Sequence, residues 1–128
     1  TQSGMPSDEE DQVSSADQQK INQFSRLNGR LHEIGEELDI QRKAVDELND
    51  LGDELILLDD DEPIKYNFGE CYLEVTKDRA EKLIENLLET KNAALSVTQD
   101  ELAQCKSTLQ DLKNQLYARF GTNINLEE

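Results

Sequence analysis

Large apolar side chains recur along the first half of the chain at alternating steps of three and four residues. Ten positions follow this spacing, and eight of them are apolar. They are Phe24, Leu27, Leu31, Ile34, Leu38, Gln41, Val45, Leu48, Gly52 and Leu55. An average period of 3.5 residues, kept over more than four heptads, is typical of a helix in a coiled coil. The spacing predicts a long helix over residues 16–58.

The same spacing returns in the second half of the chain, where eight of eleven positions are apolar if Cys105 is counted. They are Ile84, Leu88, Lys91, Leu95, Thr98, Leu102, Cys105, Leu109, Leu112, Leu116 and Arg119. Thr76 is a candidate N-cap, and Gly121 suits the position just after a helix. We therefore predict a second helix over residues 77–120, antiparallel to the first. Cys105 is interpreted as a small apolar residue of their seam and not as a reactive thiol.

The segment between the two helices has a different period. After Asp59-Asp60-Asp61-Glu62-Pro63 the apolar side chains alternate with polar ones, first at Ile64, Tyr66 and Phe68, then at Cys71, Leu73 and Val75. A period of two on either side of Gly69-Glu70 predicts a β-hairpin. A lone two-stranded hairpin is marginal in water and leaves two open edges. We expect a mainly α fold, an antiparallel coiled coil of two long helices joined by a β-hairpin, and an obligate oligomer joined through the hairpins.

Composition limits the kinds of partner. The 128 residues carry 29 acidic and 13 basic side chains, a net charge of −16, and only 35% are apolar. Such a charge argues against binding nucleic acid or an anionic membrane surface. Residues 1–15 are polar enough to predict a disordered acidic tail. Without an apolar stretch of spanning length or a secretion signal, and with two cysteines lacking zinc or redox spacing, we expect a soluble cytoplasmic protein.

Sequence motifs for catalysis are missing. There is no phosphate loop, dinucleotide fingerprint, nucleophile elbow or zinc-protease motif. The single histidine, His32, reads as an ordinary surface residue. The run Asp59–Glu62 lacks the alternating ligands and glycine of a calcium loop, so a solvated connector is the better interpretation. We expect no catalytic residue, no metal, no cofactor and no enzymatic activity.

Apolar residues also gather where the outer helix ends should meet. Antiparallel pairing places Ile21, Phe24 and Leu27 near Leu116, Tyr117, Phe120, Ile124 and Leu126. We expect part of this group to stay exposed. Two interpretations stay open: a staple that closes the coil, or an adaptable apolar surface for non-native chains, which offer apolar segments without a fixed shape.

Several local stretches carry a family resemblance. They are Asp17-Gln18-Gln19-Lys20-Ile21-Asn22 with Phe24, the acidic connector with Tyr66-Asn67-Phe68-Gly69-Glu70, and the C-terminal Leu116-Tyr117-Ala118-Arg119-Phe120-Gly121-Thr122-Asn123-Ile124-Asn125-Leu126-Glu127. With a helix, a single hairpin and a helix, the chain resembles β-type subunits of the prefoldin family. The resemblance covers everything after Ala16.

The resemblance implies a hexamer of two α-type and four β-type subunits, whose hairpins form a β-barrel platform from which the coils project. It implies an ATP-independent co-chaperone that holds unfolded actin and tubulin and delivers them to the cytosolic group II chaperonin. A cytoplasmic location follows, with a nuclear role left open. By position, clients would contact Ile21, Phe24, Leu116, Phe120, Ile124 and Leu126. The platform would contain Ile64, Tyr66, Phe68, Cys71, Leu73 and Val75.

Two other classes compete with a chaperone subunit. A homodimeric coiled-coil tether or scaffold fits the composition equally well, but a tether has no need to interrupt its coil with a hairpin. A small hydrolase or metal enzyme would need a cluster of chemical groups that the sequence lacks.

Overall fold

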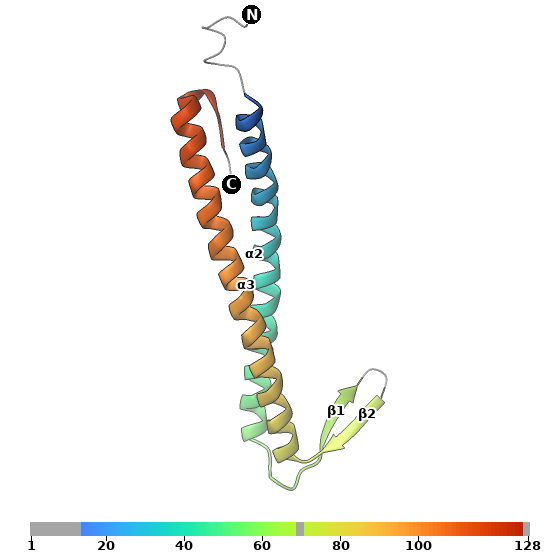
Figure 1. Cartoon of the computed structure of the whole chain (residues 1–128). Coiled ribbons are helices and arrows are strands. Elements are labelled where there is room, and N and C mark those ends of the chain that lie inside the picture. The colour runs from blue at the N-terminus through green and yellow to red at the C-terminus, as the bar shows by residue number, and fades with distance from the viewer. Residues whose placement is uncertain (1–13, 69–70, 127–128) are drawn as a thin grey trace, which may run out of the picture. The chain divides into compact units, whose positions relative to one another are not determined.

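The computed structural model describes residues 14–68 and 71–126, without the side chains of 66–68 and 71–73. In chain order the elements are helix α2 (Ser15–Ile56), strands β1 (Ile64–Phe68) and β2 (Cys71–Val75), helix α3 (Lys77–Phe120) and the 3-10 turn η1 (Gly121–Asn123) (Figure 1). Two long helices pack together, and a small antiparallel hairpin connects them. The predicted fold class is confirmed.

Helix α2 differs from its predicted range at both ends. It begins at Ser15, where the backbone N–H of Asp17 donates to the Ser14 hydroxyl at 3.0 Å, an N-cap contact. The rest of the predicted tail lies outside the described residues. At the other end, the N–H groups of Leu57 and Leu58 bond three residues back, to Glu54 and Leu55. This tightened last turn ends α2 two residues earlier than the apolar run suggested.

Helix α3 covers the same residues as the predicted second helix, and its end residues have the expected roles. The Thr76 hydroxyl accepts a hydrogen bond from the N–H of Arg79 at 3.2 Å. At the C-terminal end, Gly121 has φ +60°, a left-handed conformation that glycine adopts without steric cost. The chain therefore reverses direction directly after Phe120.

The hairpin pairs Ile64 with Val75 and Phe68 with Cys71, antiparallel and without a bulge. Ile64 and Val75 are half-buried and pack against a small core of Leu55, Ala80 and Ile84. The predicted turn at Gly69-Glu70 lies outside the described residues, as do the side chains of Tyr66, Phe68, Cys71 and Leu73. The end of the hairpin at Ile64 and Val75 is thus fixed to the adjoining helix ends by apolar contacts.

The chain divides into two compact units, Thr1–Glu36 with Asp100–Glu128, and Glu37–Gln99. The first contains the larger apolar cluster, composed of Phe24, Ile34, Cys105, Leu109, Leu112, Leu116, Phe120 and Leu126. The second contains the small core under the hairpin and the buried seam residues Leu38 and Val45. Over the described range, neither α2 nor α3 nor any shorter helix is apolar enough over a sufficient length to cross a membrane.

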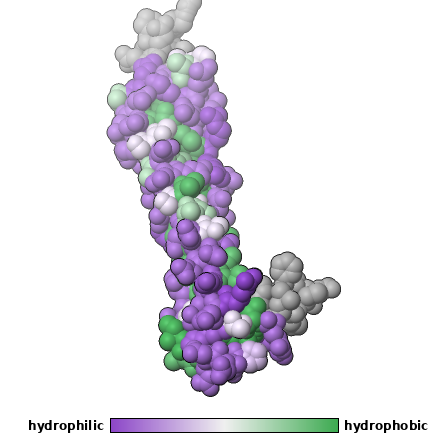
Figure 2. Space-filling view, turned by 60° about the horizontal axis from the view of Figure 1, so that its bottom comes forward, coloured by the Kyte–Doolittle hydropathy of each residue, from purple (hydrophilic) through white to green (hydrophobic). Residues whose placement is uncertain are grey.

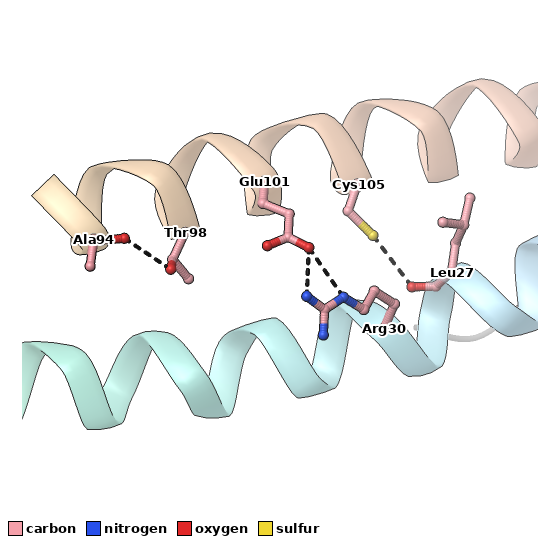
Figure 3. A network of polar contacts seen from close by, with 6 residues as sticks. All are labelled: Leu27, Arg30, Ala94, Thr98, Glu101 and Cys105. Carbon is pink, nitrogen blue, oxygen red and sulfur yellow. Dashed lines mark hydrogen bonds and ion pairs between the residues drawn. The ribbon is translucent and has the colours of Figure 1, made fainter.

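The polar residues at the predicted seam positions are accommodated in different ways. Thr98 is buried and its hydroxyl donates to the carbonyl of Ala94 at 3.1 Å (Figure 3). Lys91 is exposed. The Gln41 side-chain oxygen is buried and has no hydrogen-bond partner within the described part of the chain. A seam interrupted in this way packs less tightly than a continuous apolar one.

Candidate functional site

The six residues expected to bind clients lie together in the first unit. We call Ile21, Phe24, Leu116, Phe120, Ile124 and Leu126 the tip cluster; all six belong to one apolar core. Phe24 is 4% exposed, Leu116 0%, Phe120 7% and Leu126 8%. Of the wider apolar group, Tyr117 is 36% exposed, as expected of part of it, whereas these four residues are buried, an arrangement that matches the closing staple.

The cover comes from the segment after α3. We call residues 121–126 the C-terminal strap. After Gly121 it runs back alongside the helix ends (Figure 1), and Ile124 and Leu126 pack into the tip cluster. The N–H of Leu126 donates to the Tyr117 hydroxyl at 3.4 Å. The predicted C-terminal tail is thus, over residues 121–126, a packed part of the unit.

An ion pair joins the two helix ends beside this cluster. Arg119 Nε lies 3.1 Å from Asp17 Oδ2, and the guanidinium carbon lies 5.5 Å from the centre of the Phe120 ring. A hydrogen bond with the Ser14 side chain, together with Arg119, holds the pKa of Asp17 below its usual range, although burial opposes this shift. The signs also suit the helix dipoles, because the acid lies in the first turn of α2 and the base in the last turn of α3.

Further from the helix ends, a polar group borders the same core (Figure 3). Arg30 Nη2 lies 2.6 Å from Glu101 Oε2. The Cys105 thiol donates to the carbonyl of Leu27 at 3.4 Å. Burial raises the pKa of Cys105, while Arg30 lowers it and Glu101 raises it. A buried thiol with a raised pKa is a poor nucleophile, so Cys105 has the packing role that its seam position indicated.

The other end of the helices differs, because large apolar side chains are open to solvent there. Ile56 is 67% exposed and Leu57 84% exposed. A cavity of about 200 Å³, which neither of these two side chains lines, opens at the same end of the helices. Its lining is mainly apolar and consists of Leu48, Leu51, Leu55, Ile64, Lys65, Val75, Ala80, Leu83, Ile84 and Leu87. We call this cavity with Ile56 and Leu57 the hairpin-end surface; Figure 2, in which this end comes forward, shows apolar patches on it.

Lys77 fixes the connector beside this surface. Its ammonium group lies 3.1 Å from the carbonyl oxygen of Leu58, 3.4 Å from that of Ile56 and 3.5 Å from Asp60 Oδ1. Helix α2 has no basic residue in its own last turn, so Lys77 supplies the positive charge that a helix C-terminus favours. Sequence reasoning missed this contact, because it joins residues that the helical pattern places in separate elements.

Residues considered for other chemistry do not form a reactive site. His32 is exposed, and so are the acidic residues 59–62. In residues 14–68 and 71–126, as far as side chains are described, no group of three potential ligands could hold a metal ion. Of the predicted platform residues, Ile64 and Val75 lie at the hairpin-end surface; the side chains of Tyr66, Phe68, Cys71 and Leu73 fall outside the description.

Comparison with known protein families identifies the family of this chain. The family model described as Prefoldin subunit matches residues 18–123. The chain belongs to the prefoldin family. The match includes most of α2, all of α3, the hairpin and the 3-10 turn with which the strap begins. The resemblance inferred from the terminal and connector motifs is confirmed.

Individual relatives point to one type of prefoldin subunit. A probable prefoldin subunit 4 of Dictyostelium discoideum is 38% identical over 119 residues, which are 93% of this chain and 90% of the relative. Prefoldin subunit 4 of Homo sapiens is 34% identical over 116 residues, 90% of this chain and 87% of the relative. The crystal structure of the prefoldin beta subunit from Thermococcus strain KS-1 has the same fold, with a TM-score of 0.80 at 18% identity over 86% of this chain and 96% of that one.

These similarities decide between the competing classes of function. The chain is a prefoldin co-chaperone subunit, and the homodimeric tether is not favoured. Membership of the family also implies assembly with other prefoldin subunits.

Proposed function

We propose that this chain is one of four β-type subunits which, with two α-type subunits, form a hexamer that holds unfolded polypeptides without ATP. Actin and tubulin are the proposed clients, and the cytosolic group II chaperonin is the proposed recipient, which places the complex in the cytoplasm. The chain would act by binding alone, without catalysis. The observation that carries the proposal is the tip cluster, an apolar core assembled at the ends of both helices.

The composition of this core suits an unfolded client. Aromatic and branched aliphatic side chains come from both α2 and α3, and the chain as a whole carries a net charge of −16. Unfolded chains present apolar segments of many shapes, which favours a surface formed by side chains that can repack. The net charge keeps the loaded complex soluble.

The test uses the reconstituted complex and compares two positions on the helices. Phe120→Ser removes a large side chain from the tip cluster, while Val97→Ser changes an α3 residue that is 67% exposed. We expect Phe120→Ser to leave the native mass of the complex unchanged and to lower suppression of actin aggregation severalfold. Val97→Ser should preserve both properties.

Two results would count against the tip assignment. The first is full suppression of aggregation by the Phe120→Ser complex. The second is an equal loss with Val97→Ser, which would indicate that clients contact apolar residues along the helix and not the tip cluster.

A further inference from the structure

We propose that the C-terminal strap occupies the position that a client segment takes in the loaded complex. The proposal rests on the proposed function and specifies its ligand: an extended polypeptide stretch with two apolar side chains separated by one residue. Ile124 and Leu126 then act as an internal substitute for the client, and not as residues that contact it.

The strap already has the form of such a ligand. Ile124 has the extended backbone angles φ −124° and ψ 143°. Along the strap, Ile124 is half-buried, Asn125 is exposed and Leu126 is buried. Alternation of this kind is what an extended chain shows when it lies with one side on an apolar surface. The tip cluster therefore accommodates an extended segment with side chains at positions i and i+2.

The strap packs on large apolar side chains that come from both helices. Phe24 from α2 and Leu116 and Phe120 from α3 share the cluster with Leu126, and each is at most 7% exposed. Moving the strap away would uncover part of these large side chains. A client segment with the same spacing would cover them again, and the identity of its two apolar residues would matter little.

The attachment of the strap is suited to exchange. Ile124 and Leu126 pack into the tip cluster, and the bond from the Leu126 N–H to the Tyr117 hydroxyl, at 3.4 Å, is long for a hydrogen bond. Segments with few buried contacts open more readily than a helix core does. If the strap covers the site most of the time, the apparent affinity for a client is reduced by the fraction of sites that are open.

The experiment measures client binding to this subunit within the assembled complex. The probe is reduced, carboxymethylated α-lactalbumin, which stays unfolded, and a photo-cross-linker at the exposed position Ala118 reports binding at this tip. The double variant Ile124→Ser with Leu126→Ser releases the strap. The matched control, Thr122→Ser with Asn123→Ser, changes two exposed strap residues.

We expect the double variant, in which the strap is released, to bind the probe with a dissociation constant about tenfold lower at this subunit. This factor corresponds to a covered state that is favoured over the open state by about 1.4 kcal/mol in the unmodified chain. The control should bind as the unmodified complex does. Tyr117→Phe, which removes only the hydroxyl acceptor, should shift binding in the same direction by a smaller factor and so tests the proposal without disturbing the apolar core. A peptide with the sequence of residues 121–128 should compete with the probe, and the same peptide with both apolar residues changed to serine should not.

The outcomes separate the strap from the function on which it rests. Weaker binding by the double variant would overturn the proposal and make Ile124 and Leu126 client contacts, with the proposed function intact. Unchanged binding would also overturn it. If the probe failed to cross-link in every complex, including the unmodified one, both the proposed client binding at the tip and the proposed role of the strap would be wrong.

Discussion

At the scale of single residues, the structure's main addition is a set of contacts between positions far apart in the sequence. Asp17 and Arg119 are separated by 102 residues and close the helix ends with one ion pair. The seam pattern included Arg119 without giving it a partner, and Asp17 appeared only within a family motif. Periodicity identifies which face of a helix is buried but not which polar groups meet across it.

The hydrogen bond of the Asp17 carboxylate with Ser14, together with its ion pair with Arg119, predicts a particular dependence of stability on pH. The folded-state pKa of Asp17 is lowered, so the carboxylate stabilises the fold at pH values above the ordinary carboxyl pKa. This contribution is lost as the pH falls through the lower folded-state value. Asp17→Asn should therefore reduce the melting temperature at pH 7, and the difference from the unmodified chain should shrink as the solution is acidified.

Thermal unfolding followed by circular dichroism from pH 7 down to pH 2 would check this. Asp111→Asn, at an exposed position of the same unit, is the control and should have little effect at any pH. A deficit for Asp17→Asn that stayed constant to the lowest pH would mean that the charge of the Asp17 carboxylate does not stabilise the helix ends.

At the scale of elements, glycines give opposite expectations at two positions. An added Cβ at Gly35, inside α2, would meet no atom within 4 Å. Gly35→Ala should therefore stabilise the chain by about 1 kcal/mol, because alanine loses less backbone freedom in a helix. Gly121 has φ +60°, where an alanine is strained, so Gly121→Ala should cost about 1 kcal/mol. Urea unfolding of both variants gives the free energies, and equal signs would contradict the assignment of Gly121 as the turning point of the strap.

Sequence reasoning predicted the elements well, because the change from a period of 3.5 to a period of two is strong at residue 64. Thr76 and Gly121 were sufficient to place the ends of α3. The end of α2 was placed two residues late, since Leu57 and Leu58 continue an apolar run after the helical bonding has tightened. The cover over the tip cluster was one of two interpretations left open, because a heptad pattern ends at Gly121 and does not describe how the following segment packs.

At the scale of the whole molecule, the two units differ in how far their large apolar side chains are covered. The tip cluster is closed by the chain's own strap, whereas the hairpin-end surface leaves Ile56 and Leu57 largely exposed. Nothing within the described chain covers the latter surface, and the family implies assembly with other prefoldin subunits. The hairpin-end surface is therefore where we expect those subunits to bind, in continuity with the open edges of the hairpin.

A charge placed in the cavity lining should prevent this assembly while the chain still folds. Leu51 is 45% exposed and Leu87 is 37% exposed, so Leu51→Asp with Leu87→Asp removes little from the core of the isolated chain. Burying the exposed share of each leucine against a partner contributes about 1 kcal/mol, and burying the new carboxylates would add a further cost. The double variant should raise the dissociation constant for assembly at least about tenfold.

Native mass spectrometry of the reconstituted complex measures the loss, and circular dichroism shows whether the chain remains helical. Val97→Asp places the same charge at another exposed apolar position of α3, outside the cavity, and should assemble normally. A complete complex with the double variant would exclude the cavity from the interface. Loss of assembly in both variants would instead make added negative charge on a chain of net charge −16, and not the place where it is added, the cause of the defect.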